Sequence, residues 1–201
     1  MKQLCISAGL WLATGVALHA QLGELSISAG RAAARNNVLG TARDLAGAVL
    51  DYKSETNFRL GFRFTFNSYR FFGHEIGYAY NRGKLTVNTR PPAEVGLPVH
   101  QGIYNFLAYA TAEGAAVRPF IAGGGHFGTF YPPGTGVFSG NGVTKFGFNY
   151  GAGLKFRVSP LLMLRLDLRD YATAKPFGES FPDQKGLLRI LEVSMGLGIA
   201  F

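Results

Sequence analysis

The sequence has little charge, one cysteine and no long apolar run. Charged residues make up 16% of the 201 residues and hydrophobic residues 47%, a balance that excludes an intrinsically disordered chain. The longest candidate for a membrane helix, residues 6–18, is shorter than the roughly 20 residues required and is broken by polar and glycine residues. No segment carries a sustained helical stripe, and only the Ala-rich piece 42–50 predicts a short helix, placed in a loop.

The first residues have the pattern of a secretory signal peptide. Lys2 precedes the apolar stretch, and small residues end it just before Gln21. We therefore predict cleavage near Ala20, which divides the chain into a signal peptide, 1–20, and one mature domain, 21–201. Cleavage removes Cys5, so the mature chain has no disulfide, no thiol nucleophile and no cysteine-bound metal.

Alternation of apolar and polar residues is the main structural signal of the mature chain. Residues 57–66 are apolar at every even position and polar or glycine at every odd one, a period of two that predicts a β-strand. The same pattern returns in 146–158 and 162–168. Less regular strand-like segments are 24–31, 72–81, 103–112, 118–130 and 187–201. The total of about eight such segments predicts an all-β fold.

The connectors between these segments alternate in length. The long ones are 32–56, 82–102, 131–144 and 174–186, and the short ones are 67–71, 113–117 and 159–161. In an up-and-down meander, long and short connectors lie at opposite ends of the strands. This arrangement predicts an eight-stranded antiparallel up-and-down transmembrane β-barrel, with long loops at one end and tight turns at the other.

The polar face of the strands is predicted to line the lumen. It is rich in glycine and serine and carries charges of both signs, which suits a narrow interior where small residues fit and charges pair. The opposite face carries almost no charge, as lipid requires. A soluble lipocalin-like barrel with its arginines outside is the alternative. The predicted lumen charge network is Glu24, Arg59, Arg63, Glu75, Lys155, Arg157, Arg165, Asp167, Arg169 and Glu192.

The C-terminal strand ends the chain on an aromatic residue. This strand resembles the β-signal read by the outer-membrane assembly machinery, with Ser194, Gly196, Ile199 and Phe201 at its four positions. With the strand–turn–strand pattern of 149–171, the mature chain resembles the eight-stranded outer-membrane β-barrel superfamily, similar to the OmpA-like transmembrane domain. The resemblance implies export through the periplasm to the outer membrane of a Gram-negative-type bacterium, with the assembly machinery as a partner. It implies no reaction and no cofactor.

Catalytic, metal and nucleic-acid sites are not predicted. In His126-Phe127-Gly128, glycine stands where lipid A deacylases carry a nucleophilic serine, and His74 and His100 lie on other segments. The net charge of +8 could suggest nucleic acid, but the basic residues divide between lumen and loops. Cations in or beside the long connectors are candidates to bind outer-membrane lipid and lipopolysaccharide, with an ordinary solvated loop surface as the alternative: Arg35, Arg43, Arg82, Arg90 and Lys175.

Two functional classes remain, and both take the protein as a monomer. The first is a structural or surface-interaction protein with a filled lumen and long extracellular loops. The second is a small, weakly anion-preferring pore, because the lumen candidates are six basic against four acidic residues. Eight-stranded interiors are normally filled by side chains, which favours the first class. A lipid A-modifying enzyme is a third and weaker alternative.

Overall fold

The computed structural model describes residues 23–36, 38–43, 46–132, 134, 140–178, 180–181 and 186–201. The predicted signal peptide, 1–20, lies outside the described residues. Within these ranges, no helix is long and apolar enough to cross a membrane.

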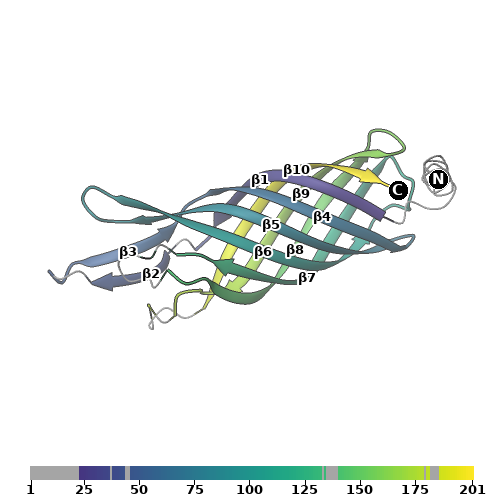
Figure 1. Ribbon diagram of the computed structural model, residues 1–201. Helices are drawn as coiled ribbons and strands as arrows, with labels where there is room; N and C mark the ends of the chain where they lie inside the picture. Colours follow the sequence, from purple (N-terminus) through teal and green to yellow (C-terminus); the bar gives the residue numbers. More distant parts are fainter. Residues whose placement is uncertain are drawn as a thin grey trace, which may run out of the picture.

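The described residues form an antiparallel barrel with a projecting hairpin (Figure 1). The strands are β1 (Gly23–Ala34), β2 (Val38–Arg43), β3 (Val49–Ser54), β4 (Asn57–Tyr69), β5 (Phe72–Val87), β6 (Ala93–Tyr109), β7 (Val117–Phe130), β8 (Val143–Arg157), β9 (Leu162–Ala174) and β10 (Leu187–Ala200). Strand β1 pairs with β4 on one side and β10 on the other, and the β5–β6 pairing completes the ring. The predicted eight-stranded up-and-down barrel, formed by β1 and β4 to β10, is confirmed.

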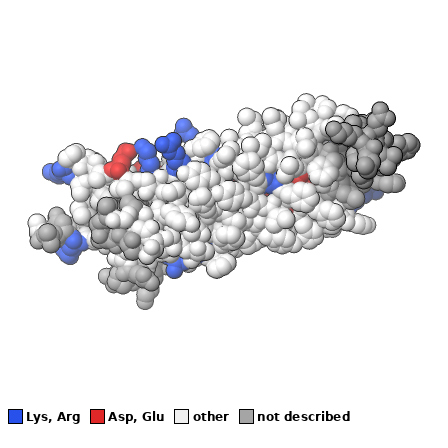
Figure 2. All heavy atoms as spheres, in the orientation of Figure 1, with Lys and Arg blue, Asp and Glu red and all other residues white. Residues whose placement is uncertain are grey.

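Side chains alternate between the interior and the outer wall, as period two requires. Along β10, Glu192 and Ser194 are buried, whereas Val193 and Met195 are exposed. The outer wall therefore presents a band of apolar side chains, and the middle of the molecule is largely uncharged in Figure 2. This arrangement places the polar positions inside and agrees with the transmembrane orientation rather than the lipocalin-like one.

The helix predicted around 42–50 is not formed by the described residues of this segment, 42–43 and 46–50. Strands β2 and β3 make a hairpin there, and β3 continues the sheet by pairing with β5, with Tyr52 opposite Val87. Leu39 and Tyr52 are buried in this hairpin. Strand geometry lets their side chains reach the other apolar residues at this end of the barrel, and this tertiary packing overrides the weak local preference for helix.

The connector predicted for 82–102 is also wrong in extent. Strands β5 and β6 continue to Val87 and from Ala93, and they extend past the barrel body beside the β2–β3 hairpin (Figure 1). In this extension the polarity of the two faces is inverted, because Leu85 and Leu97 are buried whereas Lys84 is exposed. Such a pattern is typical of a sheet in water, so the extension lies beyond the apolar band.

An apolar cluster fills the inside of the barrel at this same end. Its members come from β2, β3, β5, β6, β7, β10 and the β9–β10 connector: Leu39, Tyr52, Leu85, Val87, Leu97, Val99, Phe130, Phe177, Phe181 and Leu188. The interior is therefore apolar in the extension and mainly polar in the barrel body, where a smaller apolar cluster is formed by Leu107, Tyr109, Phe120 and Ala122.

Candidate functional site

The barrel interior contains a network of buried charges. Nine of the residues predicted for it are buried: Glu24, Arg59, Arg63, Glu75, Lys155, Arg165, Asp167, Arg169 and Glu192. They come from β1, β4, β5, β8, β9 and β10, so the network ties together strands that are far apart in the sequence.

Two carboxylates hold the arginines of β9. Glu75 accepts from Arg165 Nη1 at 2.6 Å and from Arg169 Nη2 at 2.8 Å. Asp167 accepts from Arg165 Nε at 2.7 Å and from Arg169 Nη2 at 3.1 Å. Each guanidinium is thus shared by two carboxylates, a charge-assisted arrangement that satisfies several donors of each group.

Glu192 is the third carboxylate and pairs with the arginines of β4. Arg63 Nη2 lies 2.7 Å and Arg59 Nε 2.9 Å from its oxygens. The hydroxyls of Tyr171 and Ser194 donate to the same carboxylate, at 2.8 and 2.6 Å. Because Arg63 Nη1 also lies 3.7 Å from an oxygen of Asp167, the carboxylates and arginines form one continuous cluster.

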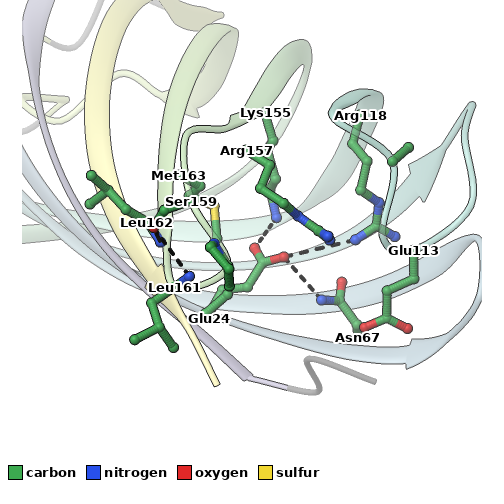
Figure 3. Close-up of a pocket in the computed structure, with 13 residues that line it drawn as sticks. Glu24, Asn67, Glu113, Arg118, Lys155, Arg157, Ser159, Leu161, Leu162 and Met163 are labelled. Atoms are coloured by element: carbon green, nitrogen blue, oxygen red, sulfur yellow. Dashed lines mark hydrogen bonds and ion pairs between the residues drawn. The ribbon is translucent and has the colours of Figure 1, made fainter. Parts of the chain in front are cut away.

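A second, smaller cluster lies near the end of the barrel with the tight turns, and Figure 3 shows three of its residues, Glu24, Arg118 and Lys155. Lys155 bonds to Glu24 and donates to the hydroxyl of Tyr109 at 2.9 Å. Arg118 lies 3.8 Å from Glu24 and its guanidinium carbon lies 3.6 Å from the centre of the Tyr109 ring. Arg118 is buried but was not predicted, because it stands beside a proline at the start of a glycine-rich strand in which alternation is weak.

Arg157 is not part of the buried network, and its prediction was wrong. It is exposed at the end of β8 and lines a pocket at the mouth of the barrel with Glu113 and Arg118 (Figure 3). Its side chain has the same strand parity as Lys155, but the barrel ends there and water reaches it. In the turn that borders this pocket, partial burial raises the pKa of the Glu113 carboxyl, and the positive charge of Arg118 opposes the shift.

The three histidines that the structure describes are not brought together. His126 lies in the lumen, 2.6 Å from the hydroxyl of Thr173, whereas His74 and His100 lie on the outer wall and bond to tyrosine hydroxyls. A histidine and a hydroxyl in contact can form a nucleophilic pair. His126 and Thr173 are both buried in the lumen, however, so their contact does not indicate a catalytic site. Across the described ranges, no group of three or more potential ligands is placed to hold a metal ion.

The predicted assembly-signal residues divide between the two faces of β10. Ser194 is buried, and Ile199 and Phe201 are exposed on the outer wall. Gly196 packs against β1 so closely that an added Cβ would lie 2.5 Å from the carbonyl oxygen of Ile27. The backbone of Phe201 exchanges two hydrogen bonds with Gly23, which fastens the end of the chain to the start of β1.

The structure is similar to solved outer-membrane barrels. Neisserial surface protein A has a TM-score of 0.62 at 12% identity, with 91% of this chain and 99% of that chain covered. OprG from Pseudomonas aeruginosa has a TM-score of 0.62 at 13% identity, with 91% and 99% covered. The N-terminal β-barrel domain of Pseudomonas aeruginosa OprF has 0.51 at 13% identity, with 91% and 100% covered.

Comparisons of sequence give no such match. No protein-family profile and no curated protein matches the chain. The similarity therefore rests on structure, and it concerns the fold. The chain has the fold of the eight-stranded outer-membrane β-barrel proteins.

Proposed function

We propose that this protein is an integral outer-membrane barrel that is closed to ions and acts at the cell surface through its projecting β2–β3 and β5–β6 hairpins. The observation that carries the proposal is the presence of two different obstructions along the same lumen. One is the buried charge network in the barrel body, and the other is the apolar cluster in the extension.

The charge network obstructs the lumen because its groups are already paired. Glu75, Asp167 and Glu192 face Arg59, Arg63, Arg165 and Arg169, and all seven side chains are almost completely buried. An ion entering this region would have to separate charge pairs that lack water to replace them. The network also fills space that the narrow interior of an eight-stranded barrel leaves for side chains.

The apolar cluster obstructs the lumen by excluding water. Phe177 and Phe181, from the connector between β9 and β10, are buried among apolar residues of β5, β6 and β10. An apolar constriction stops ions even where it is not completely filled, because a hydrated ion gains nothing there in return for its lost water. Both obstructions would have to open for the lumen to conduct.

The anion-preferring pore remains the alternative. The central cluster holds four arginines against three carboxylates, so its formal charge is 4 − 3 = +1, which would favour anions if the lumen opened. A lipid A-modifying enzyme receives less support, since the contact between His126 and the Thr173 hydroxyl is buried inside the barrel and the other two described histidines bond to tyrosine hydroxyls.

Single-channel recording tests the proposal. The mature chain, 21–201, is refolded and inserted into a planar bilayer after heat-dependent gel mobility has established that the barrel is folded. We expect a silent bilayer. Steady anion-selective current that changes in Arg165→Gln, but not in the exposed mouth variant Arg157→Gln, would replace this proposal with the pore.

A further inference from the structure

The outer wall carries a group of arginines where its apolar band ends. On β1, the outward positions Leu25, Ile27 and Ala29 are followed by Arg31 and, just beyond the strand, Arg35. The same change occurs on the adjacent strands, where Val193 of β10 is followed by Arg189 towards the extension, and Leu168 of β9 by Asp170.

Asp170 holds two of these arginines in fixed positions. Its carboxylate accepts from Arg189 Nε and Nη2, each at 2.8 Å, and from Arg35 Nη1 at 3.0 Å. Arg189 also donates to the hydroxyl of Tyr150 at 2.6 Å. The Asp170 side chain is 7% exposed beneath them, whereas that of Arg35 is 60% exposed and that of Arg189 33%. One buried carboxylate thus leaves an excess of outward-facing guanidinium groups.

Arg31 adds a cation whose side chain has no ion-pair partner among the described residues. It lies opposite Val193 on one side and Phe58 on the other, and Phe58 in turn lies opposite Arg82 of β5. In the described part of the chain, neither Arg31 nor Arg82 forms an ion pair. An exposed arginine at the edge of an apolar surface is stabilised only where water or an anion meets it.

An apolar groove runs along the barrel wall from these arginines. Its outward-facing lining includes Ala29, Ala152, Leu168, Val193 and Met195, and Arg31 lies at its edge. The two alanines hollow the surface because their neighbours carry longer side chains. The groove and the arginines therefore share β1, β9 and β10.

We infer that this part of the wall binds a phosphorylated, multiply acylated lipid of the outer leaflet, with a phosphate on Arg31 and Arg189 and an acyl chain in the groove. Arginine presents a planar fork that matches phosphate oxygens and tolerates partial dehydration better than lysine. The lipid part of lipopolysaccharide has this chemistry. The site lies outside the lumen, so this inference goes beyond the closed barrel and holds whether or not the lumen conducts.

Native mass spectrometry of the folded mature chain with diphosphorylated lipid A tests the inference. We expect one tightly bound lipid on the wild-type protein. In the double variant Arg31→Gln/Arg189→Gln, loss of charge-assisted contacts weakens binding at least about tenfold. The matched control, Arg157→Gln, removes one cation at the opposite end of the barrel and leaves lipid binding unchanged. Equal binding by the wild type and the double variant would overturn the site.

Two further measurements separate the parts of the site. Ala29→Phe fills the groove while leaving every arginine in place, and weaker lipid binding is expected. This variant also decides the matter if the double arginine variant does not fold, since undiminished binding would overturn the groove. The second measurement compares two probes, dephosphorylated lipid A and inorganic phosphate. If dephosphorylated lipid A bound as tightly as the diphosphorylated form, or if millimolar inorganic phosphate displaced the bound lipid, the site would not select a phosphorylated lipid.

Discussion

Removing the negative charge of Glu75 gives the sharpest test of the lumen network. Glu75 is fully buried, and two guanidinium groups lie within 2.6 and 2.8 Å of its oxygens. In Glu75→Gln the side chain keeps its shape, but the central cluster changes from a formal charge of +1 to +2. Breaking a buried ion pair by removing one partner costs about 3–5 kcal/mol, because the remaining charge is left buried and uncompensated.

The assay is urea-induced unfolding of the refolded barrel in lipid vesicles, followed by circular dichroism. The matched control is Glu94→Gln, since Glu94 pairs with Lys84 at 2.8 Å and both side chains are 60% exposed. An exposed pair contributes only about 0.2–1 kcal/mol. In Glu75→Gln/Arg165→Met the cluster returns to its original excess of one positive charge, and we expect most of the lost stability to be recovered. If Glu75→Gln cost no more than Glu94→Gln, the network would not be a tightly paired structure.

Three further predictions concern other parts of the barrel. Deleting Phe201 is expected to reduce the folded fraction in the outer membrane, measured by heat-dependent gel mobility in cells; unchanged assembly would contradict its role as an assembly signal. Gly124→Val is expected to lower the unfolding midpoint far more than Gly123→Val, because an added Cβ would lie 2.0 Å from the carbonyl oxygen of Tyr104 at position 124 but no closer than 3.9 Å to any neighbour at 123. Folding raises the pKa of Glu113 above 4.5, so this carboxyl contributes most to the stability of the folded barrel at low pH, and the contribution declines as the pH rises above that value. The urea midpoint of the wild type should therefore fall relative to that of Glu113→Gln as the pH rises. Parallel pH profiles of the two proteins would argue against the raised pKa.

Strict alternation made most of the barrel body predictable from sequence. In 57–66 and 162–168 the charged residues face in and the apolar residues face out, with the exception of the buried Met163, so the strand and its orientation follow from the same pattern. The charged residues of these segments were placed in the lumen for the same reason. The roles of Ser194, Gly196, Ile199 and Phe201 in assembly stay predictions.

The extension was not predictable in the same way. Along β5 the period of two continues, but from Arg82 to Val87 the outward residues are polar and the inward ones apolar. A pattern whose sign changes partway gives no single buried face, so the sequence alone predicts a connector in this segment. Arg157 was misplaced for a different reason: alternation gives the direction of a side chain but not the level at which the barrel ends.

The closing contact of the barrel joins the two ends of the described chain. Strands β1 and β10 are paired without interruption, from Glu24 with Ala200 to Ala34 with Ile190. Such a pairing spans nearly the entire sequence, so the entropy of bringing the ends together is lost before these hydrogen bonds form. A chain truncated before β10, or one in which β10 has not yet paired with β1, would keep two open sheet edges that can pair with other chains. The pairing of the last strand with the first is therefore the step that removes both edges at once.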